Sequence, residues 1–288
     1  MKHILSVSRR SDIPAFYGEW FLQKVREGSV TLPSPFSRRI QVVSLRPEDV
    51  SAIVFWSKNY QPFWPILKQI KPLYSGRFLF HLTINGFRSS AKILLEPSAP
   101  DTEKSLKTAH LLCDEYSPEK ILWRFDPIIF SNLTPPEERL EAFSKLAEQL
   151  RGLTQRCYVS FVDLYGKVKR RFNAVEASGK IQFNKPELSE QVAFLESLKP
   201  IATTAGIQLF TCCEDAVGAA ADLPKGHCID AELLKRIFPD EEFPTQVRPT
   251  RPQCGCYISR DIGAYRTCRH ACLYCYAQWV EQISLFTI

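Results

Sequence analysis

The sequence of 288 residues predicts an α/β fold, arranged as a partial or full (β/α) barrel of the TIM type, and three observations lead to it. Six short runs are almost continuously apolar, which fits parallel strands covered on both faces better than antiparallel strands with one wet face. Segments with apolar residues at helical spacing alternate with these runs. Polar residues follow the runs directly, at the strand ends where active sites of such barrels lie.

The predicted strands are rich in β-branched and aromatic residues. In chain order they are Ile4–Ser8, Ala52–Trp56, Phe78–Ile84, Ile121–Phe125, Cys157–Asp163 and Ile207–Cys212. The predicted helices are Pro14–Glu27, Thr102–Glu115, Pro135–Leu150 and Glu187–Thr204. Each helix carries aliphatic or aromatic residues on one stripe, and prolines lie at or just before the start of three of them, where a proline is well tolerated.

Polar side chains recur at the ends of the predicted strands. They are Asp12, Ser57, Lys58, Asn59, His81, Thr83, Asn85, Arg124, Asp126, Asp163 and Glu214. Any single one of them could be a helix cap or a member of a buried pair. Because the carboxyl ends of parallel strands meet at one edge of a sheet, their recurrence predicts a functional site at that edge.

The sequence becomes rich in proline and polar residues after Phe238. Pro239, Pro244, Pro249 and Pro252 interrupt a polar run, which predicts an extended linker. We therefore expect the α/β barrel in residues 1–244, and a proline-rich linker with a cysteine segment packed on the barrel in residues 245–288. A short helix is predicted around Ala277–Leu285. The chain contains no Walker loop, no G-x-G-x-x-G and no H-E-x-x-H motif.

The composition is that of a folded globular protein, with 45% hydrophobic and 24% charged residues. The net charge of +6 is a mild excess that permits an anionic partner without requiring one. Ten cysteines are present, yet the apolar run Ile4–Val7 is too short for a signal peptide and no run approaches the ~20 residues of a membrane span. We expect a cytoplasmic protein, without membrane contact, whose reduced thiols serve metal or redox chemistry.

The most specific motif is Cys268-Arg-His-Ala-Cys272-Leu-Tyr-Cys275, with C-x3-C-x2-C spacing. Three thiolates this close can ligate three irons of a [4Fe–4S] cluster and leave the fourth iron open to a substrate or cofactor. The alternative is a structural zinc site, which needs four ligands, usually in two C-x2-C pairs. His270 could be the fourth zinc ligand, but its position inside the loop would strain the geometry. The spacing favours the iron–sulfur cluster.

The other cysteines fall into two groups. Cys113 and Cys157 stand alone among apolar neighbours and are predicted core residues. An auxiliary metal site, most simply a second iron–sulfur cluster, could be formed by Cys212, Cys213, Cys228, Cys254 and Cys256. Alternatively Cys212 is a core residue, since strand alternation turns only one of Cys212 and Cys213 inward.

The cysteine spacing, with an aromatic residue before the last cysteine, resembles the radical S-adenosylmethionine (SAM) superfamily. Residues 262–277, with His270 and the ending Tyr274-Cys275-Tyr276-Ala277, resemble the cluster loop of the spore photoproduct lyase-like branch. Three upstream segments resemble that branch's strand, Leu-Glu-Pro-x-Ala-Pro turn and following strand: residues 80–84, 95–100 and 124–129. Ser57-Lys58 resembles its Thr-Lys-Ser element. The sequence as a whole resembles the DUF1848 family.

One feature departs from the superfamily pattern: its cysteine loop follows the first barrel strand, whereas here the loop lies at the C-terminus. The chain therefore resembles a circularly permuted radical SAM barrel, or a barrel whose cluster loop is delivered by a tail. The family's Gly-Gly-Glu element is absent in recognisable form.

The resemblance implies an enzyme that binds a [4Fe–4S] cluster and SAM and generates a 5′-deoxyadenosyl radical, which abstracts hydrogen from a substrate. It implies an electron donor such as flavodoxin or ferredoxin. By the family pattern, Tyr274 packs against the adenine of SAM. Thr83, Asn85, Arg124 and Asp126 would contact its amino, carboxylate or ribose groups, or else form an ordinary strand-end network. No catalytic residue is assigned.

The sequence leaves two classes of substrate, a small molecule or a nucleic acid. Nine arginines surround the two chain ends: Arg9, Arg10, Arg38, Arg39, Arg248, Arg251, Arg260, Arg266 and Arg269. They could bind a phosphorylated or nucleic-acid substrate. Alternatively they form a solvated face, or pair with Asp12, Asp261 and an anionic cluster, which the small net charge favours. A different class of function is an iron–sulfur or zinc protein that binds nucleic acid or senses redox state without cleaving SAM.

Overall fold

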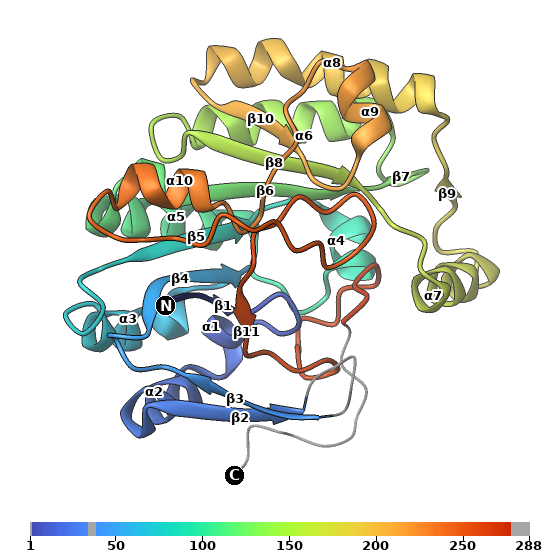
Figure 1. The fold of residues 1–288 in the computed structure, drawn as a ribbon. Helices are drawn as coiled ribbons and strands as arrows, with labels where there is room; N and C mark the ends of the chain where they lie inside the picture. Colours follow the sequence, from blue (N-terminus) through green and yellow to red (C-terminus); the bar gives the residue numbers. More distant parts are fainter. Residues whose placement is uncertain (1, 34–38, 278–288) are drawn as a thin grey trace.

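The computed structural model describes residues 2–33 and 39–277, and its centre is a seven-stranded parallel sheet (Figure 1). The strand order is β10-β8-β6-β5-β4-β1-β11. The strands are β1 His3–Val7, β4 Val50–Ser57, β5 Phe78–Thr83, β6 Ile121–Ile128, β8 Arg156–Phe161, β10 Gln208–Thr211 and β11 Arg260–Asp261. All six predicted strands are present, so the prediction of a parallel α/β fold is confirmed. Within the described residues the edge strands β10 and β11 do not pair, so a closed barrel is not shown.

Ten α-helices are described. They are α1 Ile13–Phe16, α2 Gly18–Glu27, α3 Trp64–Ile70, α4 Ser89–Leu95, α5 Thr102–Tyr116, α6 Pro136–Gln149, α7 Gly166–Ala177, α8 Leu188–Thr204, α9 Asp215–Ala220 and α10 Ala231–Ile237. The predicted helix Pro14–Glu27 is broken in two at Tyr17, where the backbone leaves the helical region. The other three predicted helices match α5, α6 and α8. The predicted helix Ala277–Leu285 lies outside the described residues, except for Ala277.

Smaller elements complete the chain. Two antiparallel pairs join β2 Ser29–Pro33 to β3 Ile40–Ser44 and β7 Phe130–Ser131 to β9 Phe183–Asn184. The 3₁₀ turns η1 Gln61–Phe63 and η2 Pro118–Lys120 precede α3 and β6. No helix among the described residues has the length and apolar character that a membrane crossing requires.

The two faces of the sheet are covered by different parts of the chain. Because strand side chains alternate, Leu5, Phe55 and Trp123 lie in one core, which includes residues of α2, α3, α5, α6 and α8. Their neighbours Ile4, Val54 and Leu122 lie in a second core. Its remaining members include α10 residues and the buried Cys254 and Cys256 of the tail. The tail after α10 therefore covers the second face, and the ribbon crosses the sheet there (Figure 1).

Strand β11 brings the two ends of the chain together. It pairs parallel to β1, with Leu5 opposite Arg260 and Ser6 opposite Asp261. The Asp261 carboxylate accepts hydrogen bonds from Ser6 Oγ (2.6 Å), Ser8 Oγ (3.0 Å), and the backbone N–H groups of Arg9 (3.0 Å) and Gly263 (2.9 Å). Ion pairs with Arg9 and Arg10 complete its surroundings. This buried carboxylate fixes the tail to the first strand.

We expect Gly263→Ala to destabilise this junction by about 3 kcal/mol, because overpacking a tight contact forces the backbone to move. A Cβ atom at Gly263 would lie 1.6 Å from Ser8 Oγ and 2.6 Å from Ser8 Cβ. Urea unfolding measures the change. Gly166→Ala is the control, because nothing lies within 4 Å of a Cβ at that position. Equal stability of the two variants would contradict the prediction.

Candidate functional site

The cysteine loop, residues 262–277, follows β11 directly and is held by backbone contacts to the N-terminal half. Leu273 N–H donates to the carbonyl of Leu95 at 3.0 Å, and Tyr17 OH donates to the carbonyl of Thr267 at 2.6 Å. Burial raises the pKa of the Cys272 thiol well above its ordinary value, and the charged groups that act on it are Lys58, Glu96, Cys275 and Cys268. Cys275 N–H donates to the carbonyl of Cys272 at 3.1 Å, and Lys58 Nζ lies 5.8 Å from the ring centre of Tyr274, so this part of the loop lies beside a cation.

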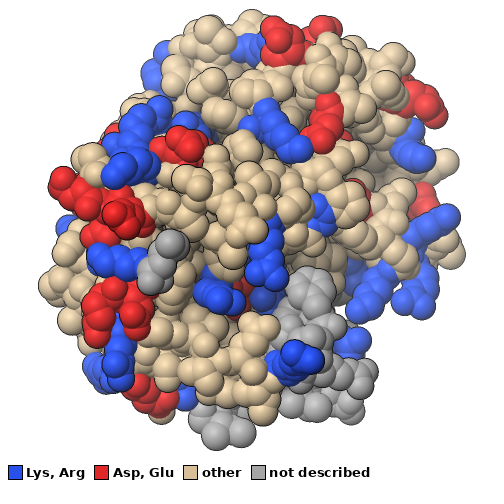
Figure 2. Space-filling view, in the orientation of Figure 1, with Lys and Arg blue, Asp and Glu red and all other residues tan. Residues whose placement is uncertain are grey.

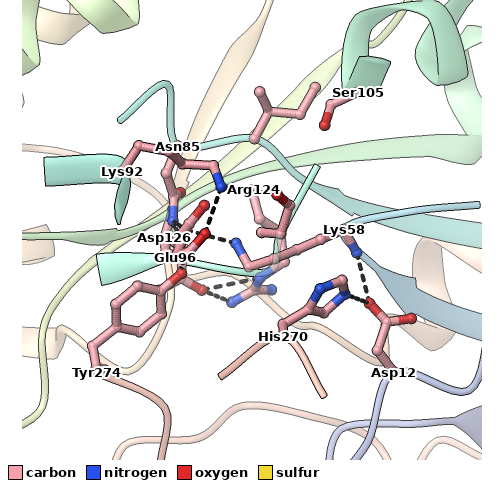
Figure 3. A network of polar contacts seen from close by, with 12 residues as sticks. Asp12, Lys58, Asn85, Lys92, Glu96, Ser105, Arg124, Asp126, His270 and Tyr274 are labelled. Carbon is pink, nitrogen blue, oxygen red and sulfur yellow. Dashed lines mark hydrogen bonds and ion pairs between the residues drawn. The ribbon is translucent and has the colours of Figure 1, made fainter. Parts of the chain in front are cut away.

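Glu96 is the centre of the polar network shown in Figure 3. Its Oε1 accepts from Lys58 Nζ at 2.8 Å, from Asn85 Nδ2 at 2.9 Å and from Tyr274 OH. Although burial opposes ionisation, the Lys58 ammonium and the hydrogen-bond donors hold the pKa of Glu96 below its ordinary value. The loop tyrosine is therefore tied to a buried carboxylate that lies at the C-terminal end of α4.

The network continues across the strand ends through Asn85. Asp126 N–H donates to Asn85 Oδ1 at 2.8 Å, and Asn85 Nδ2 also contacts Tyr274 OH at 3.2 Å. Arg124 Nε donates to Asp126 Oδ2 at 3.0 Å. Of the five residues predicted to contact SAM, Asn85, Arg124, Asp126 and Tyr274 are thus linked directly. Thr83 lies beside them, in the wall of a small hollow that Lys58, Asn85 and Glu96 also line.

His270 is fully engaged by protein groups. Its Nε2 lies 2.8 Å from Asp12 Oδ2, and its Nδ1 lies 3.2 Å from the carbonyl oxygen of Ser98. Asp12 also accepts from Lys58 N–H at 2.9 Å and from Ser57 Oγ at 2.7 Å. A metal bond through either ring nitrogen would displace one of these contacts. The arrangement does not fit His270 as the fourth ligand of a zinc ion.

The five cysteines outside the loop also come together. Cys212 and Cys213 follow β10, Cys228 precedes α10, and Cys254 and Cys256 lie in the tail. Cys212 Sγ lies 3.3 Å from Cys228 Sγ. Cys212, Cys228, Cys254 and Cys256 belong to the second core, and Cys213 packs against it. We call these five residues the cysteine ring. Cys157 is buried in the main core, and Cys113 packs against that core.

Neither cysteine group is shown to bind a metal. Among the residues that the structure describes, no three His, Cys, Asp or Glu side chains are arranged to hold one metal ion. Iron–sulfur ligation at both groups therefore remains a prediction.

Of the eight described arginines around the chain ends, three form ion pairs with buried or strand-end carboxylates. Arg9 and Arg10 form ion pairs with Asp261, and Arg251 forms one with Asp163. The side chains of Arg39, Arg248, Arg260, Arg266 and Arg269 are exposed. Arg38 lies outside the described residues.

Glu96 and Arg171 were not predicted from the sequence as site residues. Lys58 was predicted at a strand end, but its ion pair with Glu96 joins residues 38 positions apart. Arg171 of α7 donates to the carbonyls of Leu273 (2.8 Å) and Cys275 (2.5 Å). Nothing in the local sequence of α7 indicates this contact, because it depends on how α7 packs on the loop.

Glu214 makes stability depend on pH near neutrality. Burial raises the pKa of its carboxyl to about 7, against a hydrogen bond from Phe161 N–H, and the charges of Asp163 and Asp126 add to the shift. The folded-state pKa exceeds the unfolded value of 4.5, so the folded state holds the proton more tightly. The stability that this proton contributes is complete below pH 4.5 and is lost as the pH rises through about 7.

We expect Glu214→Gln, which cannot ionise, to gain stability relative to the wild type as the pH is raised from about 5 to about 8. The melting temperatures of both proteins across this range measure the effect. A difference that does not change with pH would contradict it.

Comparison with known proteins gives one clear match. A family model described as "Domain of unknown function (DUF1848)" matches residues 4–277. No curated protein matches the chain. Solved structures match weakly: a D-hydantoinase from Bacillus sp. AR9 has 14% identity, a TM-score of 0.30 and 60% coverage of this chain. A dihydropyrimidinase from Brevibacillus agri has 14% identity, a TM-score of 0.32 and 62% coverage. The chain spans 37% of the length of each of these proteins.

Proposed function

We propose that this chain, which belongs to the DUF1848 family, is a radical SAM-type enzyme that binds a [4Fe–4S] cluster and SAM and generates a 5′-deoxyadenosyl radical. The observation that carries the proposal is the position of the cysteine loop. Its three thiols lie beside a buried network of carboxylates and cations at the carboxyl ends of parallel strands, where α/β active sites are found.

The place of β11 supports a circularly permuted partial barrel. In the superfamily that the loop resembles, the cysteines follow the first strand. Here β11 is the last strand in the chain, yet it pairs parallel to β1 and leads directly into the loop. A loop that departs from a sheet strand in this way starts at the same sheet edge as the polar network. Permutation of the chain thus leaves the spatial relation of strand and loop intact.

The donor set fits the cluster. Three cysteines supply three thiolates, and Lys58 acts electrostatically on both Cys272 and Cys275, so it would offset the negative charge of a thiolate-bound cluster. The cluster supplies one-electron chemistry when bound. The carboxylates of Glu96 and Asp126 are suited to the amino group of SAM, and Lys58 and Arg124 to its carboxylate. Thr83 and Asn85 can bind hydroxyl groups, and Tyr274 offers a ring to the adenine.

The test is 5′-deoxyadenosine formation. The full chain is reconstituted anaerobically with iron and sulfide, then given dithionite and SAM, and the product is measured by mass spectrometry. We expect 5′-deoxyadenosine from the wild type and none above background from Cys272→Ala. A protein with confirmed iron and sulfide that forms no 5′-deoxyadenosine would overturn the proposal and leave the non-SAM iron–sulfur alternative.

An anionic substrate is supported by the surface beside the loop. Figure 2 shows Lys and Arg side chains gathered over α7, at the right of the view. Lys167 and Lys169 are exposed there, while Arg171 of the same helix contacts the loop. A phosphate-bearing substrate bound at this surface would lie next to the cysteines.

We expect Lys167→Glu with Lys169→Glu to weaken binding of a single-stranded oligonucleotide at least about tenfold at low salt, because phosphate contacts dominate such affinity. Fluorescence anisotropy measures it. The control is Lys104→Glu with Lys107→Glu on α5, which changes the net charge equally and whose side chains are also exposed. Equal affinities of the two variants would argue against a nucleic-acid substrate at α7.

A further inference from the structure

The cysteine ring brings together thiols from three separate segments of the chain. Four of its members are almost completely buried, at 5% exposure for Cys212, 8% for Cys228, 7% for Cys254 and 3% for Cys256. Cys213 is the more exposed member, and its backbone has a left-handed φ of 60°. The sequence alone left open whether Cys212 belongs to the hydrophobic core or to a site. Its Sγ contact of 3.3 Å with Cys228 places it in the ring as well.

Three arginine side chains lie beside the cysteine ring. Arg124 Nη1 lies 3.1 Å from Cys228 Sγ, and Arg251 Nε lies 3.0 Å from Cys213 Sγ. Arg9 is part-buried and forms an ion pair with Asp261. Each of these arginines also pairs with a carboxylate, Asp126, Asp163 or Asp261. Thiolates bound to a cluster would add negative charge on the side of each guanidinium that faces the sulfurs.

A hydrogen-bonding group beside the ring has no partner. His81 is completely buried; its Nε2 lies 2.8 Å from the carbonyl oxygen of Cys228, and its Nδ1 has no partner. Arg9 Nη1 is a second buried nitrogen without a partner. Buried polar atoms are almost always satisfied, so each such atom calls for a specific explanation. His81 Nε2 donates its proton to the Cys228 carbonyl, so Nδ1 of the neutral imidazole is an acceptor and cannot serve a sulfide. Arg9 Nη1 is a donor, and the sulfides of an iron–sulfur cluster accept hydrogen bonds that tune the cluster.

We infer that the cysteine ring is a second iron–sulfur centre, separate from the loop, with Cys212, Cys228, Cys254 and Cys256 as ligands. Each thiol that ligates iron releases its proton to solvent as the Fe–S bond forms. Cys213 stays outside the centre, beside Arg251. This inference goes beyond the proposed function and does not depend on it.

The geometry favours a cluster over a single zinc ion. A tetrahedral zinc site places all four sulfurs about 3.8 Å from one another, given Zn–S bonds of about 2.3 Å. Among the described residues no three side chains of the ring converge on one ion. Four thiols can instead ligate the two irons of a [2Fe–2S] cluster, two to each iron, and Cys212 and Cys228, whose sulfurs lie 3.3 Å apart, would share one iron.

The test uses a chain without the three loop cysteines, so that bound iron can be assigned to the cysteine ring. The full chain carrying Cys268→Ala, Cys272→Ala and Cys275→Ala is reconstituted anaerobically with ferrous iron and sulfide and then desalted. We expect about two to four irons per chain, an equal amount of sulfide, and an iron–sulfur electron paramagnetic resonance signal after reduction. Adding Cys228→Ser and Cys256→Ser should abolish iron and sulfide. Adding Cys213→Ser instead should leave both unchanged, which makes it the matched control.

Several results would overturn the inference. The loop variant is the chain with Cys268→Ala, Cys272→Ala and Cys275→Ala. The inference fails if this variant holds no iron or sulfide, or if it takes up only zinc from a zinc solution. It also fails if the only change that mass spectrometry detects is a Cys212–Cys228 disulfide. If the Cys228→Ser and Cys256→Ser changes prevent folding, the iron and sulfide of the loop variant and of its Cys213→Ser form decide the matter. Because the loop variant needs no SAM, failure here is distinct from failure of the 5′-deoxyadenosine assay.

Discussion

Glu96→Ala is expected to lower the free energy of unfolding by about 3–5 kcal/mol and to reduce 5′-deoxyadenosine formation at least about 100-fold. The substitution leaves the Lys58 ammonium buried without its anion, because the side chains of the pair are only 13% and 6% exposed. It also removes the acceptor of Tyr274 OH and Asn85 Nδ2. Urea unfolding and the product assay measure the two effects.

The control is Glu148→Ala, which removes an exposed carboxylate paired with Arg151. Exposed pairs contribute about 0–1 kcal/mol, so this variant should keep both stability and activity. If Glu96→Ala forms as much 5′-deoxyadenosine as this control, the polar network around Glu96 has no role in the reaction. Glu96→Gln should lie between the two in stability, because the amide still accepts hydrogen bonds from Lys58 and Tyr274.

The pH dependence of the Glu96 effect has a defined sign. The folded-state pKa of Glu96 lies below its unfolded value of 4.5, since Lys58 and its donors outweigh burial. The stability that ionised Glu96 contributes is therefore present above pH 4.5 and is lost as the pH falls through the folded-state pKa. The difference between wild type and Glu96→Ala should shrink in acid, opposite to the direction expected for Glu214→Gln near neutrality.

The strands that could be predicted are those whose signal is local. Each of the six apolar runs lies in a parallel sheet that is covered on both faces, so its consecutive residues are apolar and can be recognised locally. Strand β11 consists of two charged residues, so no apolar pattern marks it. It pairs with β1 through Asp261 and its hydrogen bonds to residues about 250 positions away, which no local pattern contains.

The candidate site divides in the same way. Residue types at strand ends indicated Asn85, Arg124 and Asp126 because strand direction alone places them at one edge. Glu96 is not at a strand end, and its three donors lie 11, 38 and 178 positions away. The spacing of the loop cysteines is local, whereas the cysteine ring joins three segments that only the packed tail brings together. The sequence indicated which five cysteines could form a site, but it did not indicate that they lie together.

The junction at β11 connects these observations, because both cysteine groups depend on where the tail lies. Cys254 and Cys256 come before β11, and the cysteine loop comes after it. Asp261 is the buried anion at this point, with a side chain only 4% exposed, between Arg9 and Arg10. Losing it would free the tail from the first strand and disturb both groups at once.

We therefore expect Asp261→Ala to cost about 3–5 kcal/mol and to increase protease cleavage within residues 245–277, because two arginines and two backbone N–H groups lose their acceptor. Iron retained after reconstitution should fall at both cysteine groups. The control is Asp215→Ala, which breaks the half-exposed pair with Lys225 and should cost less than about 1 kcal/mol. If both variants melted at one temperature and were cleaved at one rate, the tail would be held by its apolar contacts alone, and the carboxylate would have no part in presenting the cysteines.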